Sequence, residues 1–223
     1  MKSRILSVVF ALIVFPVFAN AAVIYEQSTL DTTDQGGYQY FNQQLADDFV
    51  PTISEALRTI TWRGSYYDTD NPSSTESFTI QLFTDNAGLP SATPFFEEVG
   101  LASKVSVGTL VGKTLYEYSM SVQGPILNTG TKYWINIYTN DFPTNYAWAV
   151  STDGTPDGAV RYGAVPWDDF DNNRSNHVFA LSGPAAPPPA SVPTMNEWGM
   201  IIFMVLAGLG AVYYLRRQRR AER

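Results

Sequence analysis

Cysteine and histidine, two residue types much used in nucleophilic and acid–base chemistry, are scarce in this chain. Its 223 residues include no cysteine and one histidine, His177. A single histidine cannot build a multi-histidine metal site, a serine triad would have to use it, and no Gly-x-Ser-x-Gly elbow occurs. Paired carboxylates can cleave glycosidic bonds, but that chemistry needs a defined separation across a cleft, which one sequence does not show. We therefore predict a non-enzymatic protein, with His177 as a structural or surface residue.

Aspartates cluster in segments with the composition of loops, and Asp168, Asp169 and Asp171 form one such group. Oxygen ligands at alternating loop positions are what Ca²⁺ requires, and Ca²⁺ would reduce repulsion within an acidic domain. These three residues are our candidates for a structural Ca²⁺ site, although no segment fits the EF-hand consensus. The alternative is that they are solvated turn residues, because aspartate side chains bond to nearby backbone. Further loop pairs are Asp31/Asp34, Asp68/Asp70 and Asp153/Asp157, whereas Asp47 and Asp48 lie inside a strand pattern.

Charge is unevenly distributed along the chain. Residues 22–191 carry seven basic and 19 acidic side chains, which gives a net charge of −12. Such a segment repels nucleic acid and anionic lipid, because it has no basic patch to neutralise phosphates. Cations, sugars or protein partners suit it better.

The elements that must hold these residues are strands. Apolar residues alternate with polar ones in Ile60/Trp62/Tyr66, Phe78/Ile80/Leu82, Tyr116/Tyr118/Met120/Val122, Tyr133/Ile135/Ile137, Tyr146/Trp148/Val150 and His177/Phe179/Leu181. Period-two alternation is typical of half-buried strands, and Gly-, Pro- and Asp-rich breakers separate the runs. Residues 22–183 are therefore expected to form an all-β fold, a single jelly-roll-like β-sandwich domain. The one helical turn expected in this region is around Ser54–Leu57. Trp134 and Tyr138 alternate away from Tyr133/Ile135/Ile137, so one of these two faces is a candidate exposed aromatic platform for sugars.

Residues 1–21 have the three parts of a secretory signal peptide. Lys2 and Arg4 precede an apolar run from Ile5 to Phe18, and small residues follow. Signal peptidase accepts small side chains at the positions of Ala19 and Ala21, so cleavage is expected after Ala21.

The other end of the chain has a second apolar segment. Residues 199–215 are 17 uncharged residues, at the short end of what spans a membrane as a helix. The segment 216–223 follows it, and its Arg216, Arg217, Arg219 and Arg220 favour a cytoplasmic C-terminus. Everything before Gly199 is then expected outside the inner membrane.

Residues 192–199 stand directly before this helix, after a Pro/Ala-rich linker at 184–191. They read Val192-Pro193-Thr194-Met195-Asn196-Glu197-Trp198-Gly199. Motif, apolar helix and arginine cluster in this order closely resemble the IPTL-type C-terminal sorting tail of Gram-negative bacteria, here residues 192–223. Val192, Met195 and Asn196 depart from the Ile-Pro-Thr-Leu-Ser-Glu-Trp-Gly signature but keep its apolar or polar character. The resemblance implies that an exosortase-like membrane enzyme recognises the tail. An ordinary single-span anchor with a proline-rich stalk is the alternative.

Several blocks of the middle region resemble a β-sandwich module of secreted bacterial proteins that end in sorting tails. They are Leu45–Phe49, Ile60–Gly64, Phe78–Asp85 with Gly88–Pro90, Thr131–Ile135, Trp148 and Phe179–Gly183. Each block is mainly a core pattern, so the resemblance implies a fold and an extracellular location and brings no catalytic residue.

Together these features predict an exported cell-surface or extracellular-matrix protein. Its expected partners are signal peptidase, the sorting enzyme, the inner membrane and an extracellular polysaccharide. Two alternatives stay open at this point: an anchored carbohydrate- or Ca²⁺-dependent adhesion module, and a secreted hydrolase.

Overall fold

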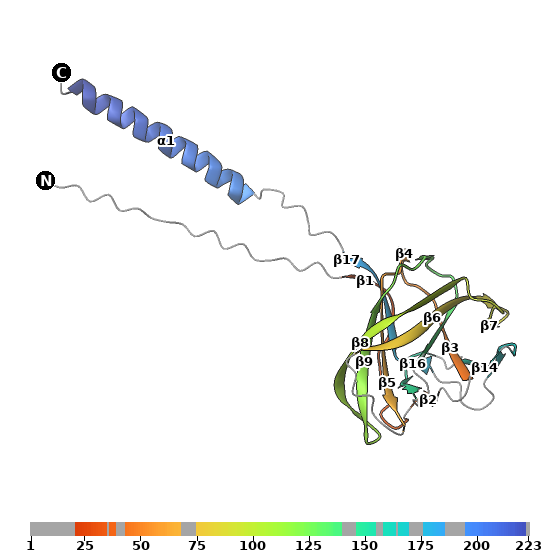
Figure 1. Cartoon of the computed structure of the whole chain (residues 1–223). Coiled ribbons are helices and arrows are strands. Elements are labelled where there is room, and N and C mark those ends of the chain that lie inside the picture. Colours follow the sequence, from red (N-terminus) through yellow and green to blue (C-terminus); the bar gives the residue numbers. More distant parts are fainter. Residues whose placement is uncertain are drawn as a thin grey trace. The chain divides into compact units, whose positions relative to one another are not determined.

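The computed structural model describes residues 21–34, 36–38, 43–67, 75–139, 146–154, 158–163, 165–169, 176–185 and 195–221. The chain divides into two compact units. All described strands belong to the unit Asn20–Ala186, and the helix α1 (Met195–Ala221) belongs to the other (Figure 1).

The β unit is built from many short strands and a few long ones. They are β1 (Ala21–Gln27), β2 (Gly37–Tyr38), β3 (Gln43–Phe49), β4 (Glu55–Ala56), β5 (Thr59–Tyr66), β6 (Thr75–Asn86), β7 (Leu89–Pro90), β8 (Phe96–Leu110), β9 (Lys113–Ser121), β10 (Ile126–Leu127), β11 (Tyr133–Thr139), β12 (Tyr146–Trp148), β13 (Val150–Ser151), β14 (Ala159–Tyr162), β15 (Asp168–Asp169), β16 (Asn176–His177) and β17 (Phe179–Ala185). The predicted all-β class with one C-terminal apolar helix is confirmed.

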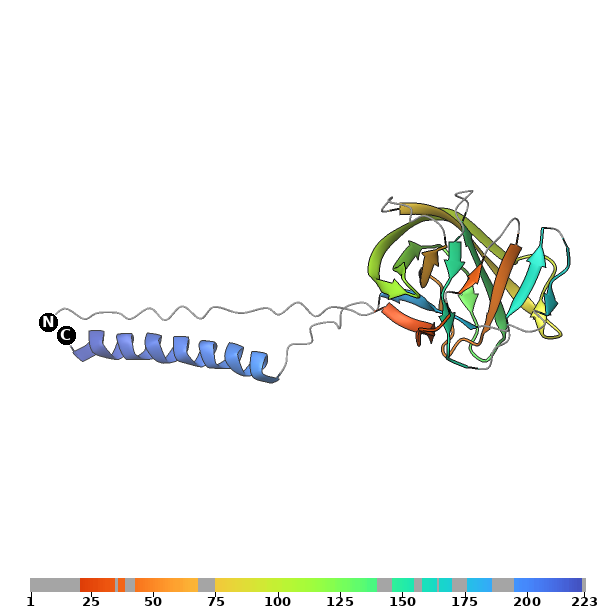
Figure 2. The same ribbon diagram turned by 90° about the horizontal axis from the view of Figure 1, so that it is seen from below.

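Most of these strands join one antiparallel sheet in the order β1-β17-β5-β9-β8-β6-β11-β3-β14-β15. The two layers expected of a sandwich are thus parts of a continuous sheet that curls around the core (Figure 2). The first and last strands of the unit lie side by side, since Ala21 pairs with Ala185. The predicted turn at Ser54–Leu57 is instead strand β4, which pairs with β10.

The main core fills the concave side of the curled sheet. The predicted alternation places Ile60, Trp62 and Tyr66 there, each at most 1% exposed. Trp62 stacks on Tyr118, with ring centroids 5.4 Å apart. Burying each large side chain contributes roughly 1.5–3 kcal/mol, so this aromatic core can hold the fold without disulfides.

A second apolar cluster covers part of the convex side. It consists of Ala46, Phe83, Trp134, Ala159 and Trp167. Trp134 is therefore buried, and its indole N–H donates to Asp85 Oδ1 at 2.9 Å. The prediction that one face of this strand is an exposed aromatic platform is wrong at Trp134, because the segment around β14 covers it.

Candidate functional site

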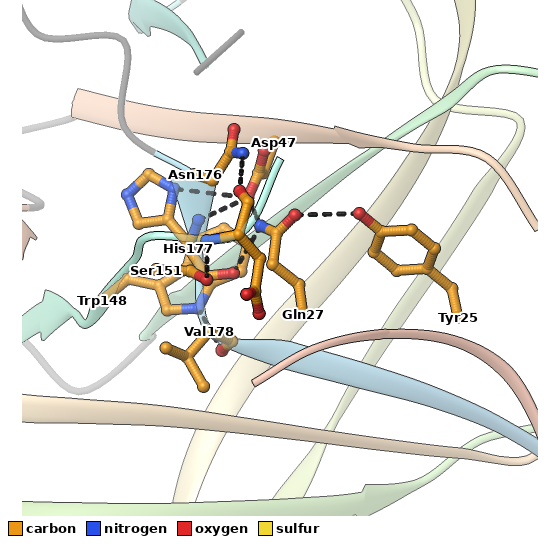
Figure 3. A network of polar contacts seen from close by, with 9 residues as sticks. Tyr25, Gln27, Asp47, Trp148, Ser151, Asn176, His177 and Val178 are labelled. Atoms are coloured by element: carbon orange, nitrogen blue, oxygen red, sulfur yellow. Dashed lines mark hydrogen bonds and ion pairs between the residues drawn. The ribbon is translucent and has the colours of Figure 1, made fainter. Parts of the chain in front are cut away.

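A buried polar network inside the β unit surrounds Asp47 (Figure 3). Asp47 is fully buried on β3, and its Oδ2 accepts hydrogen bonds from Gln27 Nε2 at 2.8 Å and from the backbone N–H of His177 at 2.5 Å. Gln27 Nε2 also donates to the His177 carbonyl at 2.7 Å, and Tyr25 donates to Gln27 Oε1 at 2.8 Å. The network ties β1, β3 and β16 together.

His177 is buried against Trp148, and the two ring centroids are 4.5 Å apart. Trp148 also contacts Phe179, which agrees with the prediction that His177 and Phe179 share a face. His177 Nδ1 lies 3.7 Å from Asp47 Oδ2. Among the described residues neither imidazole nitrogen has a hydrogen-bond partner, so no serine hydroxyl is held by the histidine as a triad requires. The geometry of these residues is that of a structural cluster.

Tyrosines near this core resist ionisation. Burial raises the pKa of Tyr25 well above its ordinary value, and nearby Asp47 and Asp48 raise it further. Burial likewise raises the pKa of Tyr146, with a smaller contribution from Glu76. A phenol that ionises less readily in the folded than in the unfolded state stabilises the fold fully below pH 10 and loses that contribution as pH rises further.

We therefore expect the unfolding free energy to fall steeply as pH rises above the ordinary tyrosine pKa of 10.0. Tyr25→Phe should flatten this decline, because phenylalanine has no proton to lose. Denaturant unfolding at several pH values between neutral and strongly alkaline measures the slope. Tyr67→Phe removes the hydroxyl group of an exposed tyrosine instead and is the matched control for loss of a phenol. Equal slopes for Tyr25→Phe and the parent chain would contradict the assignment.

The Ca²⁺ candidates are only partly within the described residues. Asp168 is exposed, Asp169 lies beside it on β15, and Asp171 lies outside the described residues. No group of three or more His, Asp or Glu side chains suited to a metal occurs in the ranges described. Asp168 lines a concavity of about 320 Å³ together with Arg161. The positive charge of the Arg161 guanidinium opposes the binding of Ca²⁺ there. The Ca²⁺ site stays a prediction.

Two other loop aspartates accept hydrogen bonds from backbone N–H groups, one local and one distant in sequence. Asp31 Oδ1 accepts from the Thr33 N–H at 2.8 Å, and Asp153 Oδ2 accepts from the Thr29 N–H at 2.8 Å. Hydrogen bonds from these threonines lower the pKa of both carboxyls. Asp31 therefore has the geometry of a turn residue, the alternative considered for the acidic loops. Asp153 instead links two segments that are 124 residues apart in the sequence.

The concavity that Asp168 and Arg161 line also contains aromatic residues. The exposed ring of Tyr162 lies beside Arg161, whose guanidinium is 4.4 Å from the Trp167 ring centroid. Desolvation by burial lowers the Arg161 pKa. An aromatic face, a guanidinium donor and a carboxylate acceptor are suited to hydroxyl-rich ligands, so the carbohydrate-binding alternative stays a prediction.

The tail is a single long helix. α1 runs for 27 residues, and its segment Gly199–Arg220 is long and apolar enough to cross a membrane, with none of its most apolar window buried. Twenty-two residues at about 1.5 Å each span roughly 33 Å, against a hydrocarbon core of about 30 Å. Arg219 and Arg220 lie in its last turn, where cations also complement the helix dipole.

The motif residues lie at the start of this helix. Val192, Pro193 and Thr194 are outside the described residues, whereas Met195, Glu197, Trp198 and Gly199 belong to the first turns of α1. The helix thus begins four residues before the predicted start at Gly199. Thr194 directly precedes the first helical residue and Glu197 is the third, which is the Thr-x-x-Glu spacing of a capping box. That signal could have placed the start of the helix from sequence.

The C-terminal segment matches a known family of sorting tails. The model of the IPTL-CTERM motif matches residues 190–220. The C-terminal tail is an IPTL-CTERM motif. A search of curated proteins finds no match to the chain.

The IPTL-CTERM match covers the Pro-Thr motif, the apolar helix and most of the arginine cluster. It implies a secreted protein that crosses a membrane and carries a sorting tail, and it implies a sorting enzyme that processes that tail. The match ends before the β unit, so it assigns no activity to the strands.

Proposed function

We propose that this protein is a non-enzymatic component of the cell surface or extracellular matrix, delivered there as the substrate of an exosortase-like enzyme. The observation that carries the proposal is the IPTL-CTERM match at residues 190–220, which coincides with a helix long enough to span a bilayer. The N-terminal segment 1–21 supports export, because it has the charge, apolar run and small residues of a signal peptide.

In this proposal the C-terminal tail directs the protein to the membrane, and the β unit is the part that is delivered. The apolar helix partitions into the membrane, and Arg216, Arg217, Arg219 and Arg220 resist transfer across it, which keeps the C-terminus in the cytoplasm. The motif then lies at the outer surface of the membrane, within reach of an intramembrane enzyme. The Pro/Ala-rich linker favours extended conformations and separates the motif from the acidic β unit.

Processing of the tail is the first testable consequence. In a host that carries the sorting enzyme, a full chain with one tag on the β unit and another after Arg223 should lose the second tag. The double substitution Pro193→Ala and Thr194→Ala should leave the chain full length and membrane-bound, with processing reduced at least tenfold. Immunoblots of membrane and released fractions measure both forms.

The matched control is Met204→Leu, which keeps the helix apolar and leaves the motif intact. This variant should be processed like the parent chain, and deletion of the enzyme gene should abolish processing of both. A parent chain that stays full length in the presence of the enzyme would overturn the proposal. Equal processing of the motif variant would show that only the helix and arginines are read.

A further inference from the structure

A buried amine and a buried carboxyl group meet on neighbouring strands of the curled sheet. Glu76 on β6 pairs in register with Ala102 on β8, so Lys104 lies two residues further along and on the same face. Lys104 Nζ and Glu76 Oε1 form an ion pair, and the two side chains are 4% and 0% exposed. The other carboxyl oxygen, Oε2, accepts a hydrogen bond from the Tyr66 hydroxyl.

Aromatic rings enclose this pair. Lys104 Nζ lies 4.4 Å from the ring centroid of Tyr116 and 5.2 Å from that of Tyr66. The Tyr118 hydroxyl donates to the Tyr66 hydroxyl at 3.3 Å, which extends the chain of phenols away from the carboxyl group. The site therefore combines a nucleophile, an electrophile and a proton donor in a setting that admits little water.

Amide formation requires a neutral amine beside a neutral carboxylic acid. The contact between Lys104 Nζ and Glu76 Oε1 lets a proton pass directly from one group to the other and so gives these two reactants. Two groups that a protein holds side by side in good alignment react as if each were present at an effective concentration of about 10⁵–10⁸ M. The enclosed site also keeps out the water that would hydrolyse the amide.

We propose that Lys104 and Glu76 condense into an intramolecular isopeptide bond. The Nζ–Cδ bond forms and the Cδ–Oε1 bond breaks. Oε1 leaves as one molecule of water, with two protons that the Lys104 ammonium gives up across the ion pair, and the amide keeps the third. The Tyr66 hydroxyl stabilises the negative charge that develops on Oε2, which becomes the amide oxygen. No oxidant, reductant or cofactor is needed, and no net charge is gained or lost by the pair.

The bond would replace two buried charges by one neutral amide and would link β6 to β8 covalently. The chain has no cysteine, so this link would supply a covalent restraint that an exported domain otherwise obtains from disulfides. Unlike a disulfide, it would survive reduction.

Peptide mapping of the full chain tests the proposal directly. The chain is expressed with its own signal segment in a host without the sorting enzyme, purified from membranes, reduced, denatured and digested with trypsin. An unmodified chain gives the separate peptides 64–104 and 105–113, because no Lys or Arg occurs between Arg63 and Lys104. An acylated Lys104 is not cut, so the expected product is the single peptide 64–113, lighter than its sequence mass by one water.

Two variants serve as controls. Lys104→Arg keeps the cation but cannot form the amide, so it should give the two separate peptides without loss of mass. Tyr66→Phe keeps the amine and the carboxyl group, and it should lower the fraction of peptide 64–113 at least tenfold in freshly folded protein. A Tyr66→Phe chain linked as fully as the parent would remove Tyr66 from the reaction.

The result that overturns the proposal is the parent chain giving only peptides 64–104 and 105–113 at their sequence masses, which would leave a simple ion pair. Loss of water that persists in Lys104→Arg would also overturn it, because the modification would then lie elsewhere. Mapping is done on denatured chains, so a variant that folds poorly still gives a readable mass.

Discussion

Asp47→Ala should lower the free energy of unfolding of the β unit by about 3 kcal/mol or more. The substitution removes the acceptor of two hydrogen bonds, from Gln27 Nε2 and from the backbone N–H of His177, in a place that is 0% exposed. The His177 N–H would lose its partner without gaining water, and a cavity would remain beside it. Guanidinium unfolding of the full chain in detergent, followed by tryptophan fluorescence, measures the change.

The neighbouring aspartate provides the control. Asp48 points the opposite way on the same strand and pairs with Lys132 at 3.1 Å, where both side chains are partly exposed. Asp48→Ala should change the stability by less than about 1 kcal/mol. Asp47→Asn should lower the free energy of unfolding by an amount between those of Asp47→Ala and Asp48→Ala, because the asparagine carbonyl can still accept both hydrogen bonds. Equal effects of Asp47→Ala and Asp48→Ala would show that the buried network does not hold the strands together.

Gly36→Ala is expected to destabilise the β unit by about 3–5 kcal/mol. Gly36 has a φ of +113°, which a side chain rarely adopts, and an added Cβ would lie 2.1 Å from the backbone oxygen of Trp148. A backbone oxygen cannot rotate away as a side chain can. The adjacent β2 pairs with β12, so relief of the clash would separate these strands and disturb the packing of Trp148. Differential scanning calorimetry measures the loss as a lower Tm.

Gly108→Ala separates the cost of a positive φ from the cost of a clash between the added Cβ and a neighbouring atom. Gly108 has a φ of +147° beside a bulge in β8, but an added Cβ would meet nothing within 4 Å. It should therefore carry only the backbone cost, about 1–2 kcal/mol. If both alanine variants lose the same stability, steric contact with Trp148 is not the cause.

Period-two alternation predicted the core well because burial acts on one face of each strand at a time. Ile60, Trp62, Phe78 and Ile80 all lie where their parity places them. The same alternation could have predicted that Asp47 is buried, since it lies on the same face of the strand as Leu45 and Phe49, which point inward. A carboxylate on the inward face of a strand needs buried donors, and this requirement marks the network around His177.

The alternation of apolar and polar residues could not predict which strands pair or what covers the outer face of the sheet. A period says which face is buried but not which strand lies alongside, so it could not distinguish two separate sheets from one curled sheet. Trp134 shows the same limit, because its convex face is covered by Trp167 and Ala159, which lie some 25–33 residues further along. The tail was predictable because its signals are local: a short motif, an apolar run and a cluster of arginines.

The pairing of β1 with β17 bears on the timing of folding during export. In the proposed export from the N-terminus, β1 is the first strand to leave the cytoplasm, yet its partner in the sheet comes from residues 179–185, the last of the β unit. The edge of the sheet therefore stays open until nearly the whole unit has been translocated, and contacts of such long sequence separation form slowly. In this order of events the sheet closes shortly before the apolar helix reaches the membrane, so the proposed retention by that helix would give the domain time to finish folding before its tail is processed.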